Sequence, residues 1–290
     1  MIDSAKYIFV GNRFFVLEEM LNLKLDIKKI FAVSGSYLEK ELIKNNIEYE
    51  LLSSKEKLVE YLLNNEFDFL IVNGCQYILP VSKISASGSN KKFINIHPSF
   101  LPDLRGADPI HAALLFGRDS GATCHIMNDN IDAGDIISQV KINYSPDYNT
   151  DLLYQLTFLA EKQVFVDAYK KEFQVSKPQS KTKHDIYYSF EPEDLEINFN
   201  DETDKIQKRI KAFSNKNKGA RFKKGENIFK VYDSKFIDKP FETEVLNGHE
   251  ENQVVFKYGD SIAIKRNKSS LLILEKIEGD LSRIQTGDIL

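Results

Sequence analysis

The sequence contains little cysteine and no long apolar run. Its two cysteines, Cys75 and Cys124, have no C-x-x-C spacing and no histidine cluster near them, so we expect reduced core thiols and no metal site. No stretch approaches the roughly 20 apolar residues that a membrane-spanning helix needs. Residues 1–7 lack the apolar core of a signal peptide. We therefore expect a cytoplasmic protein that is neither secreted nor inserted in a membrane.

The sequence also lacks a strong positive charge. Its 290 residues carry a net charge of -4, and the isoelectric point is near 5.8. This balance gives no overall attraction for nucleic acid, although a local basic patch is compatible with it. One basic run does occur, and such a run is usually a solvated face but can also meet a diphosphate. It consists of Lys205, Lys208, Arg209, Lys211, Lys216, Lys218, Arg221, Lys223 and Lys224.

The composition is that of an ordinary globular protein with more than one domain. Hydrophobic residues make up 42% and charged residues 28% of the chain, so disorder is not expected. A chain of 290 residues is long enough for one large domain and a smaller one. Serine, lysine, proline and glutamine accumulate over residues 174–184, where periodicity disappears, which indicates a linker. We therefore expect a catalytic domain (1–175), a linker and helix region (176–226) and a small β domain (227–290).

Apolar runs typical of buried strands alternate with amphipathic stretches typical of helices as far as residue 173. Such alternation predicts an α/β fold with a mostly parallel sheet flanked by helices. Ligands of such sheets bind beyond the carboxyl ends of the strands. Short alternating strands and glycine or asparagine turns predict the mainly β C-terminal domain. The expected strands cover residues 6–10, 30–34, 49–52, 69–72, 93–97, 121–127, 135–140, 228–232, 253–258, 261–265 and 271–276, and the expected helices include residues 37–45, 110–116, 150–173 and 202–213.

Two polar side chains stand together at the end of one apolar run. On an extended strand alternate residues share a face, so Asn95 and His97 are neighbours. Pro98 disfavours the helical conformation for His97 and supports a strand end there. An amide and an imidazole at the mouth of a sheet make a candidate oxyanion donor and general base. From these residues alone, a satisfied core histidine and a strand-end cap are the commoner interpretation.

A second motif follows about three dozen residues later, in the segment Ile131–Ile137, where Asp132 could reach the imidazole of His97. The combination of N-x-H-P-S-x-L-P-x-x-R-G (95–106) with D-x-G-D-I-I (132–137) resembles the 10-formyltetrahydrofolate-dependent formyltransferases. That family includes methionyl-tRNA formyltransferase, glycinamide ribonucleotide transformylase and the sugar N-formyltransferases. The resemblance implies the family's Rossmann-like fold. It also implies that Asn95, His97 and Asp132 are the catalytic residues.

The resemblance further implies a folate site at the same edge of the sheet. In the family, a loop that corresponds to Gln76, Tyr77, Ile78 and Leu79 walls the pterin pocket, largely through backbone groups. Asp135 is expected to contribute to the same site. From the residues alone, the loop is equally a plain strand-to-helix turn. The expected co-substrate is 10-formyltetrahydrofolate, and no metal is expected.

A substrate site is implied beside it. Related transformylases hold a substrate phosphate at the first strand-to-helix loop, which here contains Asn12 and Arg13. Free amides at a helix N-terminus attract anions, and Arg13 would add charge, although such a loop is also common without a ligand. The other expected substrate contacts are Ser99, Arg105, Gly106 and Tyr187. An exposed arginine such as Arg105 is often only solvated. Tyr187 is a candidate for stacking on a base, as are Tyr188 and Phe222.

The chemistry implied is formyl transfer to a primary amine. An attacking amine must lose a proton, and His97 can accept it because imidazole titrates near neutral pH. Asn95 can donate a hydrogen bond to the oxygen that gains negative charge. Asp132 is expected to orient the imidazole and, by stabilising its protonated form, to raise the pKa of His97. His125 is expected to pack or cap, and we assign it no chemistry.

The segments 11–19, 73–80 and 97–106 are most similar to the sugar N-formyltransferases. Those enzymes act on dTDP- or UDP-linked 4,6-dideoxy-amino-hexoses for surface glycans such as the O-antigen of lipopolysaccharide. We therefore expect a nucleotide-linked amino sugar as acceptor, no nucleic acid and no membrane. A homodimer is expected because a small β domain offers strand edges to pair.

Other activities stay open at this stage. Methionyl-tRNA formyltransferase and a formyltetrahydrofolate hydrolase, which would use much the same residues with water as acceptor, are the main alternatives. A glycinamide ribonucleotide transformylase ranks lower because those enzymes lack a second domain. An inactive folate- or sugar-nucleotide-binding module would keep the fold, but the intact set of Asn95, His97 and Asp132 argues against it.

Overall fold

The structure is a computed structural model that describes residues 2–88, 90–180, 182–267 and 269–290. The chain divides into two compact units. The first unit comprises Met1–Pro109, Asp119–Asn143 and Gln155–Ser189, and the second comprises Ile110–Arg118, Tyr144–Tyr154 and Phe190–Leu290. Among the described residues, no helix has the length and apolar character needed to cross a bilayer. Cys75 and Cys124 are free thiols, as expected.

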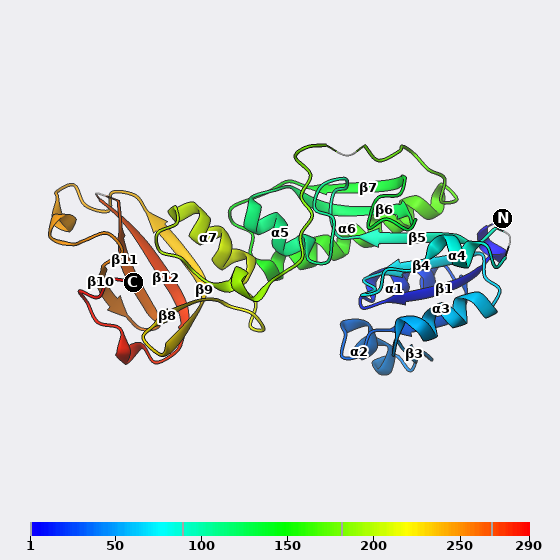
Figure 1. The fold of residues 1–290 in the computed structure, drawn as a ribbon, viewed down its shortest axis with the longest axis horizontal. Coiled ribbons are helices and arrows are strands. Elements are labelled where there is room, and N and C mark those ends of the chain that lie inside the picture. Colours follow the sequence, from blue (N-terminus) through cyan, green and yellow to red (C-terminus); the bar gives the residue numbers. More distant parts are fainter. Residues whose placement is uncertain (1, 89, 181, 268) are drawn as a thin grey trace. The chain divides into compact units, whose positions relative to one another are not determined.

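The first unit is built on a seven-stranded sheet in the order β3-β2-β1-β4-β5-β6-β7 (Figure 1). The first five strands in this order run parallel, and β6 and β7 are antiparallel additions at one edge. The expected mostly parallel sheet is therefore confirmed. The strands are β1 (Lys6–Gly11), β2 (Asp26–Ala32), β3 (Glu50–Leu51), β4 (Phe69–Asn73), β5 (Lys92–His97), β6 (Ser120–Ile126) and β7 (Ile136–Ile142).

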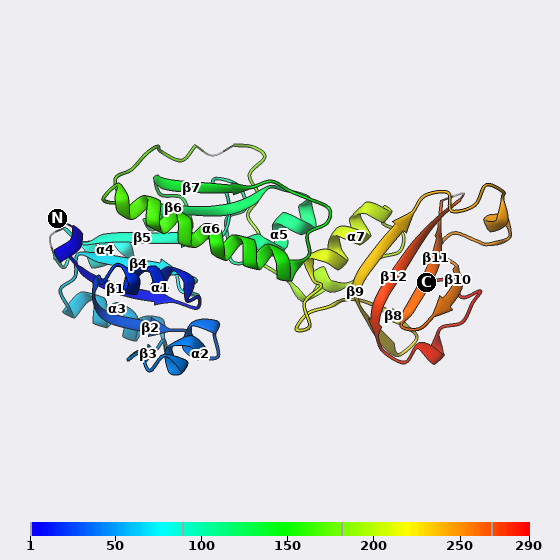
Figure 2. The ribbon, with the colours of Figure 1, turned by 180° about the vertical axis from the view of Figure 1, so that it is seen from behind.

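Helices cover both faces of this sheet (Figures 1 and 2). One face packs on α1 (Phe15–Asn22), α2 (Tyr37–Lys44) and α6 (Thr150–Lys170), and the other packs on α3 (Lys55–Asn64) and α4 (Val81–Ser85). Because both faces are buried, the central strands are almost continuously apolar. A short 3-10 helix, Ile2–Ser4, precedes β1.

The position of β1 creates the place where a ligand can bind. The chain moves from β1 outward to β2 and β3, then returns through α3 to β4 on the other side of β1. At such a switch point the connections diverge and leave a crevice beyond the carboxyl ends of the strands. β1 and β4 approach closely there, since a Cβ on Gly11 would lie 2.3 Å from the carbonyl oxygen of Asn73.

The second unit contains a five-stranded antiparallel sheet in the order β10-β11-β12-β9-β8. The expected β domain is confirmed, but its first strand was missed, because Ala220–Lys224 pairs with β9 through a tight turn at Gly225. The sequence there is rich in lysine and glycine and has little apolar alternation. The elements are α5 (Pro109–Phe116), α7 (Thr203–Ala212), β8 (Ala220–Lys224), β9 (Asn227–Ile237), β10 (Val254–Tyr258), β11 (Ser261–Arg266) and β12 (Ser270–Glu278), with 3-10 turns at Pro192–Leu195, Val245–Gly248 and Leu281–Arg283.

Because β1 and β4 approach closely, we predict that a methyl group at Gly11 destabilises the fold. Gly11→Ala forces the two strand ends apart and should lower the free energy of unfolding by about 1–3 kcal/mol, the usual cost of overpacking. Gly88→Ala is the matched control, because its Cβ would meet only the flexible end of Lys91. Denaturant unfolding of both variants measures the difference. Equal stability of the two variants would contradict the steric argument.

Candidate active site

A cavity of about 470 Å³ opens beyond the carboxyl ends of β1, β4 and β5. This volume is within the usual range of small-molecule sites, about 300–1,000 Å³. Every residue that lines it belongs to the first unit. The wall includes Asn12 and Arg13 after β1, Gly74 to Leu79 after β4, Asn95 to Pro98 at the end of β5, Gly106 to Pro109, His125, Ile131, Asp132 and Tyr187.

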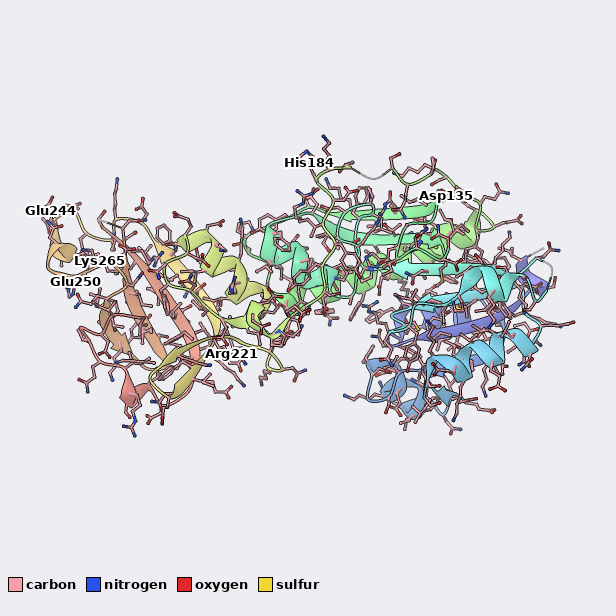
Figure 3. All side chains as sticks on the ribbon, viewed as in Figure 1. Asp135, His184, Arg221, Glu244, Glu250 and Lys265 are labelled. Carbon is pink, nitrogen blue, oxygen red and sulfur yellow. The ribbon has the colours of Figure 1, made fainter. Side chains whose placement is uncertain are left out.

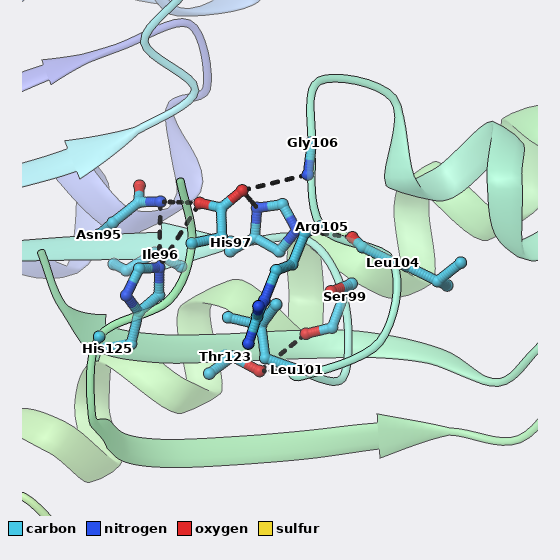
Figure 4. Close-up of polar contacts among 12 residues, drawn as sticks. Asn95, Ile96, His97, Ser99, Leu101, Leu104, Arg105, Gly106, Thr123 and His125 are labelled. Atoms are coloured by element: carbon cyan, nitrogen blue, oxygen red, sulfur yellow. Dashed lines mark hydrogen bonds and ion pairs between the residues drawn. The ribbon is translucent and has the colours of Figure 1, made fainter. Parts of the chain in front are cut away.

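Asn95 and His97 project from β5 into this cavity wall (Figure 4). Ile94 and Ile96 alternate with them and pack into the core on the opposite face of the sheet. The alternation in the sequence therefore predicted correctly which face each residue takes. Asn95 is half-buried, whereas His97 is only 4% exposed.

The hydrogen bonds of His97 determine which ring nitrogen can act as a base. Nε2 of His97 lies 2.9 Å from the carbonyl oxygen of Leu104. A carbonyl can only accept, so Nε2 carries the hydrogen. In the neutral ring, Nδ1 then keeps its lone pair, and it lies 3.5 Å from Oδ2 of Asp132. A proton taken up by Nδ1 would face that carboxylate.

The end of β5 and the Gly106 loop surround the carboxylate of Asp132. Nδ2 of Asn95 donates to Oδ1 at 3.1 Å, the backbone N–H of Gly106 donates to Oδ2 at 3.2 Å, and His97 is next to Oδ2. Burial alone would raise the pKa of Asp132, but the positive charge that His97 and His125 carry when protonated, together with the Gly106 amide, outweighs it and holds the pKa well below its usual range. The group is therefore a stable anion.

The pKa of His97 differs from the expectation. Burial is the largest effect on it and lowers the pKa below the ordinary value of 6.5, while Asp132 raises it by a smaller amount. The expected effect of Asp132 is confirmed, but the larger effect of burial was not anticipated. Burial dominates because the ring is almost fully removed from water. His97 is consequently neutral at physiological pH, as a general base must be.

His125 is also part of this cluster, although no sequence pattern pointed to it. Its Nδ1 lies 2.8 Å from the carbonyl oxygen of Ile126 and therefore donates, which leaves Nε2 to accept from Nδ2 of Asn95 at 3.2 Å. Nε2 also lies 3.7 Å from Oδ1 of Asp132. The cause is register, because β6 runs antiparallel to β5 and places His125 directly opposite Asn95. Both amide hydrogens of Asn95 are thus used within the cluster.

Other expected contacts divide into two groups. Asn12, Arg13, Gly106, Tyr187 and the loop from Gln76 through Tyr77 and Ile78 to Leu79 line the cavity, and Ile78 is 55% exposed there. The remaining three expected contacts do not line it. Ser99 is buried and donates to the carbonyl of Asp103, Arg105 is buried against Gln179, and Asp135 is exposed outside the cavity wall (Figure 3).

The three candidates for base stacking are also separated by burial. Tyr187 is 59% exposed and lies at the cavity. Tyr188 is only 8% exposed, and Phe222 is 3% exposed and stacks on Phe229 inside the second unit. Among these three, only Tyr187 has a free aromatic face available to a ligand at the cavity.

Arg13 is paired within the protein. Its guanidinium lies 3.0 Å from Oε1 of Glu161 on α6 and packs over the ring of Phe158. Glu161 is fully buried, and burial raises its pKa to about 7, although Arg13 and Asn73 act in the opposite direction. The guanidinium of Arg13, which was expected to bind a phosphate, is therefore paired with the buried carboxyl of Glu161. The sequence analysis did not identify this partner.

The segment expected to be a linker (174–184) contacts the site. The amide of Gln179 donates to the carbonyl oxygens of Asp132 and Gly134, at 3.0 and 2.6 Å. Its oxygen accepts from the guanidinium of Arg105 at 2.7 Å. Composition suggested a flexible connection, because polar residues without periodicity have no apolar face to bury. Here side-chain hydrogen bonds hold the segment in place.

Comparison with known proteins identifies related families for both parts of the chain. Residues 36–169 match the family model described as formyl transferase, and residues 190–285 match the model of the formyl transferase C-terminal domain. The methionyl-tRNA formyltransferase of Buchnera aphidicola is 31% identical over 163 residues, which are 55% of this chain and 51% of that protein. That of Listeria monocytogenes is 34% identical over 110 residues, or 38% and 35%. The chain thus spans about half, or less, of the length of these relatives.

Solved structures share the fold at low sequence identity. The N-formyltransferase of Helicobacter canadensis, solved with folinic acid and dTDP-3-aminofucose, has a TM-score of 0.69 at 17% identity over 94% of this chain and 99% of that one. A 4-N formyltransferase from Francisella tularensis has a TM-score of 0.63 at 21% identity, covering 76% and 93%. HypX from Aquifex aeolicus, solved with tetrahydrofolic acid, has a TM-score of 0.65 at 15% identity, covering 96% and 46%. Identities this low establish likeness of fold alone.

The raised pKa of Glu161 predicts a pH dependence of stability. A carboxyl that binds its proton more tightly when folded stabilises the fold at pH below its unfolded value of 4.5. That contribution is lost as the pH rises through about 7. Relative to Glu161→Gln, the unfolding free energy of the wild type should therefore fall between pH 4.5 and pH 7, by on the order of 3 kcal/mol.

Denaturant unfolding at pH 5 and pH 8 measures this difference. Glu66→Gln is the control, because the Glu66 side chain is 94% exposed. If the unfolding free energies of the wild type and Glu161→Gln change with pH in parallel, the pKa of Glu161 is not raised by folding.

Proposed function

The chain belongs to the formyltransferase family, and from that premise we propose that it transfers a formyl group from 10-formyltetrahydrofolate to the amine of a nucleotide-linked amino sugar. The observation that carries the proposal is the convergence of Asn95, His97 and Asp132 on one cavity at the switch point of the sheet. A base, an anion beside it and an amide donor are the groups that acyl transfer to an amine requires.

His97 is the proposed general base. Its Nε2–H is held by Leu104, so Nδ1 presents the lone pair that takes the proton from the attacking amine. The new N–H faces Asp132 at 3.5 Å, and the carboxylate stabilises the imidazolium that forms. The lowered pKa of His97 favours the neutral ring, which is the form that can accept a proton.

Asn95 is the proposed donor to the formyl oxygen as negative charge develops on it. Both of its hydrogens are already used, one by Asp132 and one by His125. To serve the substrate, the amide must exchange one of these bonds. The bond to His125 is the weaker one, because its acceptor is a neutral nitrogen whereas Asp132 is an anion. The proposal therefore gives His125 the role of holding Asn95 until the formyl oxygen arrives.

The loop from Gln76 to Leu79 is the proposed folate wall. It offers an apolar surface, with Ile78 more than half exposed, together with backbone polar groups beside the catalytic cluster. A flat, hydrogen-bonding ring system such as the pterin fits that combination. 10-Formyltetrahydrofolate would supply the activated formyl group there. Tyr187 then remains to stack on the base of the acceptor nucleotide.

Ion pairs in the second unit favour a small acceptor over a transfer RNA. Much of the basic run is paired: Lys205 with Asp201, Lys208 with Asp204, Arg221 with Glu196 and Lys224 with Asp288. A polyanion would have to compete with these carboxylates for each contact. The solved relative that contains dTDP-3-aminofucose points in the same direction. The proposal extends to surface-glycan synthesis in the cytoplasm by a homodimer.

Methionyl-tRNA formyl transfer is the second candidate, because the curated relatives named above are methionyl-tRNA formyltransferases. A mass-spectrometric assay separates the two. The purified chain is given 10-formyltetrahydrofolate with dTDP- and UDP-linked amino sugars, with charged initiator tRNA, or with water alone. We expect one sugar to gain a formyl group. Formylation of the tRNA alone, or release of formate without an acceptor, would overturn the proposed acceptor.

His97→Asn should abolish the transfer, because an amide cannot accept the amine's proton. His249→Asn is its control, since His249 lies in the second unit and its ring bonds to the nearby side chain of Gln253. Full activity of His97→Asn would contradict the proposed base.

Asp132→Asn tests the role of the anion. The variant keeps the size of the side chain but removes the charge that stabilises protonated His97, so kcat should fall about 10²-fold or more with the fold intact. Asp135→Asn is the matched control, since this carboxylate is exposed and lies outside the cavity wall. Circular dichroism and steady-state kinetics measure both variants. Turnover of Asp132→Asn near that of the wild type would remove Asp132 from the mechanism.

A further inference from the structure

Residues 176–180 and 182–188, here called the strap, are hydrogen-bonded to both loops of the candidate active site. At one end, Ser176 and Lys177 bond to the backbone of Ile136, just after the Asp132 loop. At the other end, the backbone of Arg105 accepts from Tyr188 and donates to Ile186, at 3.0 Å each. The strap therefore connects the loop that carries Asp132 with the loop that carries Gly106.

Gln179 lies between these two attachments and makes side-chain bonds to both loops. Its Nε2 donates to the carbonyl oxygens of Asp132 and Gly134, and its Oε1 accepts from Arg105. The two carbonyls can only accept and a guanidinium can only donate, so the orientation of the amide is fixed by its partners. An alanine or a carboxylate at this position cannot reproduce the arrangement.

The Asp132 loop needs such support. Asp132 has a φ of 45°, in the left-handed region that residues with a side chain seldom adopt, so surrounding contacts must hold it there. Gln179 binds the carbonyl of this same residue. Through Arg105, which is only 7% exposed, Gln179 also fixes the residue before Gly106, whose N–H holds the Asp132 carboxylate.

We propose that Gln179 is a positioning residue that sets the placement of the Asp132 carboxylate against Nδ1 of His97. It touches none of the reacting groups and acts through the backbone of Asp132 and through Arg105. The kinetic part of this inference rests on the proposed formyl transfer, but the placement of Asp132 does not.

Loss of the hydrogen bonds that Gln179 makes to the Asp132 loop and to Arg105 should change the titration of His97. The charged and titratable groups that act on this ring are Asp132, which raises its pKa, and His125 and Arg13, which lower it. When Gln179 no longer holds the loop, Asp132 moves away and its favourable effect weakens. The pKa of His97 in Gln179→Ala should therefore be lower than in the wild type.

Heteronuclear NMR with labelled histidine measures this titration without any substrate, with the His97 signals assigned from a His97→Asn variant. Ser176→Ala is the matched control, because it removes a bond from the strap to Ile136 at 3.0 Å but touches neither Asp132 nor Arg105. We expect a lower His97 pKa in Gln179→Ala and Gln179→Glu and a wild-type value in Ser176→Ala. Unchanged titration in both Gln179 variants, or the same shift in Ser176→Ala, would overturn the proposal.

Kinetics give a second readout. In Gln179→Ala, kcat for formyl transfer should fall about 10–100-fold while KM for the folate changes little, because misplacement of a catalytic group affects the reaction more than binding. Gln179→Glu should not rescue activity, since it keeps the acceptor for Arg105 and loses both donors. A kcat close to that of the wild type in Gln179→Ala would contradict the positioning role. If the wild-type chain transfers no formyl group but the Gln179 variants show the expected NMR shift, the proposed function is refuted. The positioning role of Gln179 then still holds.

Discussion

The candidate site depends on one largely buried anion, the carboxylate of Asp132. Burial opposes its charge, and the charge persists because hydrogen-bond donors and imidazoles surround it. These groups come from the end of β5, the opposite strand β6 and the Gly106 loop. Each of these elements is placed by a different part of the fold, so the electrostatics of one side chain depend on the register of the sheet and on two loops together.

Local pattern was enough to predict the central strands and the shared face of Asn95 and His97, because alternation is a property of the strand itself. Asp132 came from a motif resemblance. His125 could not be found in this way, since its place opposite Asn95 follows from the antiparallel register of β6. Glu161 and Gln179 were missed for a related reason, as each acts through a side chain far from its partner in sequence.

Charge and composition were less reliable guides than pattern. A basic run indicated either a solvated face or a surface for anions, whereas the structure pairs much of it with carboxylates that lie within a few residues or across the sheet. The polar segment after α6 suggested a linker and instead bonds to the site. The effect of Asp132 on the pKa of His97 was predicted with the correct sign, but the larger effect of burial was missed because burial cannot be read from neighbouring residues.

The attachment of the strap to Ile136 also bears on solubility. β7 is the outermost strand of the seven-stranded sheet, and an unpaired outer strand is a template on which another chain can add a strand. The antiparallel bridge between Ile136 and Lys177 occupies backbone groups at the start of that strand. The segment that organises the active site therefore also shields part of the sheet from edge-to-edge aggregation.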